Sequence, residues 1–237
     1  MGSLKNALWE IRCAVHQAWL SIWHSFFILE EGKFLADRTN VVLLYGFNGL
    51  PGGLVPIKEK LESLGYNVLI PNLGRGTKRI DAFARSLRIF LRKKEAPLIY
   101  WNDCTLEKLG SNLVFLGYSM GGLVALELLR KYPEYRSARV IALGTPLRGT
   151  NFAYLSSVFF SASQDLISGS DFLKGMHEYL IENLPDLYQV RARYDEIAPR
   201  SSTALPEFPA YIVFSVAGHA ALLYIDKETL QYVLSKP

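Results

Sequence analysis

The sequence has few of the residues that build metal sites, disulfide frameworks and nucleic-acid contacts. Its 237 residues include two cysteines and four histidines, and Cys13 and Cys104 lie far apart without a C-x-x-C or Cys/His ligand spacing. We therefore expect no metal site. Charged residues make up 20% of the chain, and the net charge is +4. The basic cluster between Arg75 and Lys94 is typical of a solvated helix face, and because no aromatic-rich basic motif accompanies it, we expect no nucleic-acid partner.

Long apolar runs are also missing. A transmembrane helix needs about 20 mostly apolar residues, and the longest uncharged run in the N-terminal segment, 13–29, is shorter and contains His16, Gln17 and His24. The first residues offer only Lys5 as a weak basic start of a signal peptide, Glu10 does not suit such a start, and no good cleavage site follows. These absences favour an intracellular or peripherally membrane-associated protein over a secreted one.

The N-terminal segment, residues 1–33, is set apart by its pattern. Between Leu4 and Leu29, large apolar residues recur at intervals of three and four, which predicts an amphipathic helix with one apolar stripe. Three of the four tryptophans lie here, which would suit a helix at a membrane surface. We slightly favour packing of this helix on the domain or on a second subunit, and leave the membrane surface as the alternative.

In the rest of the chain, residues 34–237, the most informative stretch is 113–130. Leu113 to Leu116 form a short apolar run that predicts a buried strand, and the leucine-rich residues up to Arg130 predict a helix. Between them lies Gly-Tyr-Ser-Met-Gly, with Ser119 at its centre. A G-x-S-x-G sequence between a strand and a helix indicates a sharp turn that exposes the serine hydroxyl, and the alternative is a glycine-rich turn with an uninvolved serine.

Further apolar runs alternate with helical patterns along this part of the chain. We expect strands at 41–45, 66–71, 139–143, 187–193 and 211–216, with helices at 57–64, 80–91 and 228–234. This order predicts βαβ units and a parallel sheet. Residues 96–110 read as irregular, with a short strand at 98–101. Residues 151–185 are too long for an ordinary loop and predict a small helical cap, or else further core helices.

The local sequence from Leu116 to Val124 resembles the nucleophile elbow of the α/β-hydrolase fold, and of bacterial lipases and esterases in particular. Gly144 to Thr150, read Gly-Thr-Pro-Leu-Arg-Gly-Thr, is similar to a lipase motif that has histidine where this chain has Leu147. Tyr45 likewise replaces the histidine of a His-Gly pair in those lipases. The resemblance implies an α/β-hydrolase fold, with a mostly parallel central sheet flanked by helices and a small cap.

A serine nucleophile needs a base, and the base needs an orienting carboxylate. In the resembling fold these follow the serine in the order acid, then histidine, which selects Asp195 and His219, since only His219 follows a C-terminal strand. Glu196 stays open as the acid. By the same resemblance, the backbone N–H groups of Phe47 and Met120 form the oxyanion hole.

The resemblance implies a serine esterase or lipase that hydrolyses an apolar acyl ester through an acyl-enzyme, without metal or organic cofactor. A thioesterase, acyltransferase or lipid-anchor deacylase with the same three residues is the alternative. A catalytically silent binding protein is a third hypothesis, which the departures from the lipase motifs at Tyr45 and Leu147 leave open.

Overall fold

The computed structural model describes residues 2–27, 29–102, 112–157, 160–213 and 218–235. Within these ranges, six parallel strands form one sheet in the order β2-β1-β3-β4-β5-β6. The strands are β1 (Asn40–Leu44), β2 (Asn67–Leu69), β3 (Leu113–Tyr118), β4 (Arg139–Leu143), β5 (Leu187–Ala192) and β6 (Ala210–Val213). The predicted parallel sheet is therefore confirmed.

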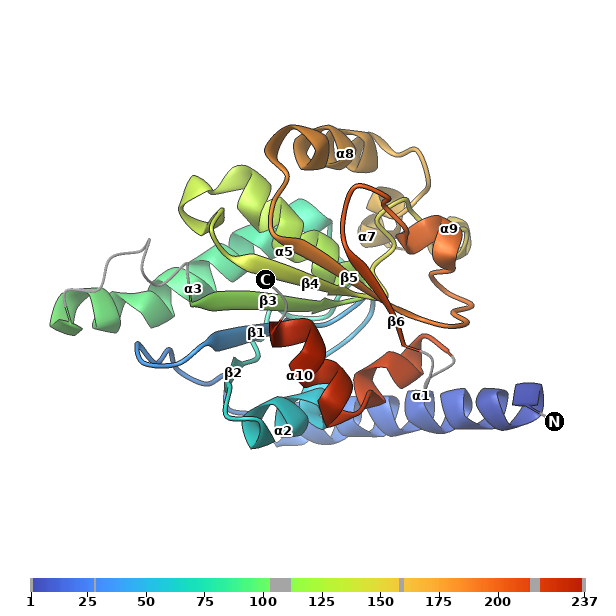
Figure 1. Ribbon diagram of the computed structural model, residues 1–237, viewed down its shortest axis with the longest axis horizontal. Helices are drawn as coiled ribbons and strands as arrows, with labels where there is room; N and C mark the ends of the chain where they lie inside the picture. The colour runs from blue at the N-terminus through green and yellow to red at the C-terminus, as the bar shows by residue number, and fades with distance from the viewer. Residues whose placement is uncertain (1, 28, 103–111, 158–159, 214–217, 236–237) are drawn as a thin grey trace.

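The strands are almost wholly apolar because helices cover both faces of the sheet. Alternate residues point to opposite sides, so that Val42 packs in one core and its neighbour Val41 in the other. On the Val42 side lie α3 (Ile80–Asn102), α5 (Met120–Lys131) and α8 (Asp171–Asn183). On the Val41 side lie α2 (Val55–Ser63) and α10 (Lys227–Ser235), and α1 (Gly2–Phe26) runs along the lower edge of the molecule in Figure 1.

Short elements complete the layers. Those that follow the carboxyl ends of strands are η1 (Pro51–Leu54), α6 (Phe152–Ser156), α7 (Ser161–Asp165), α9 (Arg200–Thr203) and η3 (Ala220–Tyr224), whereas η2 (Pro133–Tyr135) lies between α5 and the first residue of β4. In a parallel sheet all carboxyl ends meet at one edge. The loops after β1, β3, β4, β5 and β6 therefore converge, and these are the loops that carry the predicted site.

The predicted short strand at 98–101 is wrong, because α3 continues as a helix to Asn102. Its apolar run, Leu98-Ile-Tyr-Trp101, is too short for periodicity to separate a strand from a helix. The irregular stretch predicted at 96–110 is helical as far as Asn102, and its residues 103–110 lie outside the described residues. The strand predicted at 211–216 is described as far as Val213, at the end of β6.

The N-terminal helix is present as α1, but it packs in an unexpected orientation. Its inner face, which includes Cys13 and Leu20, is buried. The predicted apolar stripe lies on the opposite side and is exposed to solvent, except for Leu29, which follows the end of the helix and packs against the core. We call this stripe the outer face of α1; it consists of Leu4, Leu8, Ile11, Val15, Trp19, Ile22 and Phe26. The helix thus meets the domain through its smaller and more polar side.

Candidate active site

Ser119 stands on the turn between β3 and α5 in a strained backbone conformation. Its φ of 55° and ψ of −125° lie in a region that costs a non-glycine residue about 1–3 kcal/mol. The turn is held by Ser119 N–H, which donates to the Leu143 carbonyl on β4 at 2.8 Å. Strain of this kind at a strand-to-helix turn is characteristic of an exposed nucleophile.

The glycines of the motif are required for close packing. A Cβ on Gly117 would overlap the backbone of Gly121 and Gly122, on the opposite arm of the turn. A Cβ on Gly121 would instead overlap the Leu44 carbonyl at the end of β1. The first contact lies within the turn, whereas the second joins the turn to the neighbouring strand.

The loop after β1 passes directly beside the serine. A Cβ built on Gly46 would lie 2.8 Å from Ser119 Cβ and 3.3 Å from its Oγ, so only glycine leaves the hydroxyl accessible. Phe47 follows Gly46 and lines the same cavity as Ser119, while Met120 is the first residue of α5. The two predicted oxyanion donors are thus sequence neighbours of residues at the hydroxyl, since Phe47 follows Gly46 and Met120 follows Ser119.

His219 and Asp195, which come from the loops after β6 and β5, are joined by a hydrogen bond. The distance from His219 Nδ1 to Asp195 Oδ2 is 2.7 Å, and both side chains are less than a tenth exposed. Asp195 Oδ1 accepts from the backbone N–H of Ile197 at 3.0 Å and of Ala198 at 2.7 Å. Because a carboxylate only accepts, Nδ1 carries the proton of this bond, and Nε2 is the acceptor of the ring when the ring is neutral. His219 Nε2 is buried and, among the described residues, has no hydrogen-bond partner.

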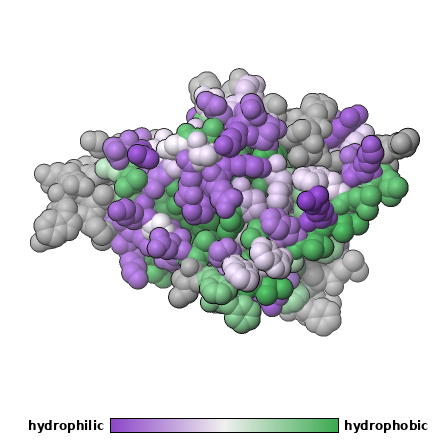
Figure 2. Space-filling model, turned by 90° about the horizontal axis from the view of Figure 1, so that it is seen from below, coloured by the Kyte–Doolittle hydropathy of each residue, from purple (hydrophilic) through white to green (hydrophobic). Residues whose placement is uncertain are grey.

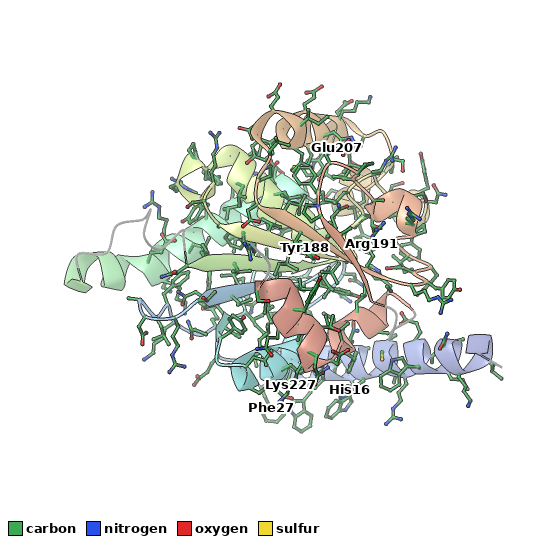
Figure 3. All side chains as sticks on the ribbon, in the orientation of Figure 1. His16, Phe27, Tyr188, Arg191, Glu207 and Lys227 are labelled. Atoms are coloured by element: carbon green, nitrogen blue, oxygen red, sulfur yellow. The ribbon has the colours of Figure 1, made fainter. Side chains whose placement is uncertain are left out.

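Glu196, the other acid left open by the sequence, interacts with α1 rather than with His219. It lines the cavity and lies near Glu10 of α1, whereas the hydrogen bond to His219 comes from Asp195. His16, His24 and His177 do not line this cavity. His16 is hydrogen-bonded to Tyr224 Oη at 2.8 Å, and Figure 3 labels it on α1, at the lower surface of the molecule.

Glu10 is a site residue that the sequence did not indicate. Its carboxylate accepts from the backbone N–H of Ala220 at 2.6 Å and of Ala221 at 2.8 Å, directly after His219. Gln17, two helical turns further, donates to the Ala220 carbonyl at 2.7 Å. Burial raises the pKa of Glu10, the two N–H groups lower it, and the Glu196 carboxylate raises it. One sequence signal existed: Glu10 and Gln17 share the face of the helix opposite the apolar stripe.

Ser119 and His219 both line a cavity of about 420 Å³, a size typical of small-molecule sites. Its wall is formed by α1, by the loop after β1, and by α6 and α7. Apolar side chains such as Phe47, Phe152 and Leu223 dominate the lining. Such a cavity suits an apolar acyl group beside a polar reaction centre.

Two residues that depart from the lipase pattern have structural partners. Tyr45 Oη donates to the Gly74 carbonyl at 2.6 Å and accepts from Leu73 N–H at 2.8 Å, which ties the loop after β2 to β1. Leu147 is buried in the core on the α5 side of the sheet. Neither substitution places a foreign charge or an unpaired polar group beside Ser119.

The described residues contain no cluster of three or more histidine, cysteine, aspartate or glutamate side chains arranged to hold a metal ion. None of the described helices is both long enough and apolar enough to span a bilayer.

No model of a known protein family matches the chain. Over 45 residues it is 44% identical to the pimeloyl-(acyl-carrier protein) methyl ester esterase of Aromatoleum aromaticum, a match that covers 19% of this chain and 18% of that protein. The chain is thus aligned with less than a fifth of that relative's length.

Solved structures of similar architecture define the fold. The mature form of the Bacillus licheniformis lipase BlEst2 superposes with a TM-score of 0.64 at 16% identity, covering 87% of this chain and 93% of that one. The thioesterase domain of the curacin biosynthetic pathway gives a TM-score of 0.56 at 10% identity, covering 86% and 93%. Aspergillus fumigatus lipase B gives 0.58 at 16%, covering 81% and 46%. The protein has the α/β-hydrolase fold that the sequence predicted.

Proposed function

We propose that the protein is a serine carboxylic-ester hydrolase whose substrate carries an apolar acyl chain. The observation that carries the proposal is the 2.7 Å bond between His219 and Asp195 at the cavity that also contains Ser119. The esterase, lipase and thioesterase names among the similar proteins support the same reaction class.

In the first half of the reaction, His219 Nε2 takes the proton of Ser119 as the serine oxygen attacks the ester carbonyl carbon. Asp195 stabilises the imidazolium that forms and holds its Nδ1 proton in place. The carbonyl oxygen becomes an oxyanion, which accepts hydrogen bonds from the N–H groups of Phe47 and Met120. The intermediate collapses when the carbon–oxygen bond to the alcohol breaks and His219 donates its proton to the leaving alkoxide.

The second half repeats these steps with water. His219 takes a proton from water, the resulting hydroxide attacks the acyl-enzyme, and the second tetrahedral intermediate releases the acid as Ser119 recovers its proton from His219. No metal or organic cofactor enters either half. In this proposal, α6 and α7 act as the small cap, because Phe152 of α6 and Ser163 of α7 line the cavity together with Leu166, which follows α7.

The proposal is tested by hydrolysis of p-nitrophenyl esters from acetate to palmitate. Ser119→Ala should abolish turnover on every ester, whereas Ser21→Ala, which alters another serine of the same cavity, should retain it. The preferred chain length separates a small-ester site from a lipase site. Equal turnover by Ser119→Ala and the wild type would refute the assignment. Activity confined to thioesters would move the protein to the alternative class.

A further inference from the structure

The outer face of α1 is an extended apolar surface without a partner in the described protein. Ile22 is 61% exposed and Phe26 81% exposed. Aromatic rings continue the surface along one flank, with Trp19 and Trp23 centroids 5.6 Å apart and Trp23 and Phe27 centroids 4.6 Å apart. Seen from below, where α1 lies, hydrophobic side chains form a band along the lower right of the molecule (Figure 2). Exposed apolar surface on this scale marks an interaction site.

The helix is fixed with this face outward. Its inner side is anchored to the segment after His219 by Glu10, which accepts two backbone N–H groups, and by Gln17, which donates to a carbonyl. His16 adds a bond to Tyr224 at 2.8 Å. Turning the helix to bury the outer face would break all of these bonds. The apolar face is therefore a stable surface of this protein.

The charged residues of α1 indicate what kind of partner its outer face would bind. Lys5 and Arg12 are exposed, and both lie beside the outer face at helical spacing. The only acid on the helix, Glu10, is turned inward and bonded to the backbone. The outward side of α1 is thus apolar and rich in tryptophan, and its charged side chains, Lys5 and Arg12, are both basic. This combination is typical of helices that lie in the interface of an anionic membrane.

The outer face is continuous with the mouth of the active-site cavity. Ala14 and Ala18 line the cavity and are also exposed. They lie three or four residues from Ile11, Val15 and Ile22, so they share one helix surface with the outer face.

Phe152 adds a further apolar side chain, because it lines the cavity and is 46% exposed. A lipid could pass from a surface under α1 to Ser119 along apolar side chains.

We propose that α1 docks the protein onto the surface of a membrane that contains anionic phospholipid, with the outer face at the headgroup–acyl boundary and the cavity mouth turned toward the lipid. A second copy of the chain is the competing occupant. It is less favoured because each copy would bring its own Lys5 and Arg12 to the contact, and because a second protein there would cover the cavity mouth. The proposal concerns binding alone and is measured without turnover, so it can fail while ester hydrolysis stands, and the reverse.

The test is flotation of the full chain with vesicles of phosphatidylcholine, with and without phosphatidylglycerol. Wild type should float with the anionic vesicles, and Val15→Ser/Ile22→Ser should weaken binding by about tenfold or more. The matched control, Ile89→Ser/Ile181→Ser, removes isoleucines that are equally exposed on α3 and α8 and should bind as wild type. Lys5→Gln/Arg12→Gln should weaken binding to anionic vesicles by about fivefold for each charge and leave binding to neutral vesicles unchanged.

Depth is measured by quenching of tryptophan fluorescence with brominated lipids, since Trp9, Trp19 and Trp23 lie on or beside the outer face. Quenching in wild type and its loss in Val15→Ser/Ile22→Ser would support docking. The proposal is overturned if wild type floats with neither vesicle, or if Val15→Ser/Ile22→Ser (the stripe variant) and its control Ile89→Ser/Ile181→Ser bind equally. It is also overturned if light scattering shows a dimer that only the stripe variant dissociates, which would assign the face to a second copy.

Discussion

The exchange of Asp195 for asparagine tests the assignment of the acid with little change in shape. Asp195 Oδ1 accepts from two backbone N–H groups, at 3.0 and 2.7 Å, and Oδ2 meets His219 Nδ1 at 2.7 Å. Asparagine keeps the oxygen that serves the backbone and places an amide N–H₂ toward the imidazole. Since that amide only donates, His219 Nδ1 must become the acceptor and its proton must move to Nε2.

That tautomer cannot accept the proton of Ser119. In serine proteases the corresponding exchange lowers kcat by about 10⁴, which is about 5 kcal/mol of transition-state stabilisation. The effect on stability should be far smaller, about 1–2 kcal/mol, because one hydrogen bond is weakened while the backbone contacts remain. Activity and stability should therefore separate in this variant.

The assay compares kcat on a p-nitrophenyl ester with the midpoint of urea unfolding for Asp195→Asn and for Glu196→Gln. The adjacent exchange also removes one carboxylate charge but leaves the bond to His219 in place, so its kcat should stay within about tenfold of wild type. Loss of kcat in Glu196→Gln with activity retained in Asp195→Asn would refute the reasoning and move the acid to Glu196.

Three further variants and one control probe the scaffold. Gly117→Ala should cost about 3 kcal/mol or more of folding free energy, because its Cβ overlaps backbone, whereas Gly175→Ala, which meets only a side-chain nitrogen at 3.4 Å, should be neutral or stabilising in the same urea titration. Tyr45→Phe removes the hydroxyl that serves two backbone groups and should cost about 2 kcal/mol, lowering Tm by about 4–8 °C; an unchanged Tm would show these bonds to be dispensable. Glu10 has a pKa raised above its ordinary 4.5, chiefly by burial, so the folded state holds this proton more tightly than the unfolded chain. The free energy of unfolding should therefore fall as pH rises from 4.5 through the raised pKa, and Glu10→Gln should flatten that decline in urea titrations across pH; an identical slope in both proteins would contradict it.

The sheet and the position of the serine could be predicted from the sequence because their signals are local. A short apolar run followed by G-x-S-x-G and a leucine-rich run specifies strand, turn and helix within residues 113–130, and β3 and α5 occupy these positions. The meeting of His219 with Asp195 also needed little beyond chain order, since both follow parallel strands whose ends share one edge.

The orientation of α1 could not be predicted in this way. A stripe of apolar residues shows that a helix has two unlike faces, but it does not say which face meets the domain. The deciding contacts join Glu10 to Ala220 and Ala221, about two hundred residues along the chain. No local pattern encodes such a pairing. For the same reason Glu10 was not recognised as a support of the histidine loop.

The measurement that tests the central claim most directly is mass spectrometry of the protein after reaction with a fluorophosphonate. An activated serine displaces fluoride from such a reagent and keeps the phosphonyl group. We predict a single adduct, mapped by peptide analysis to Ser119, that is absent from Ser119→Ala and forms in step with the loss of ester hydrolysis. An unlabelled wild-type protein, or an adduct on another serine, would contradict the proposal that Ser119 is the nucleophile of a working hydrolase.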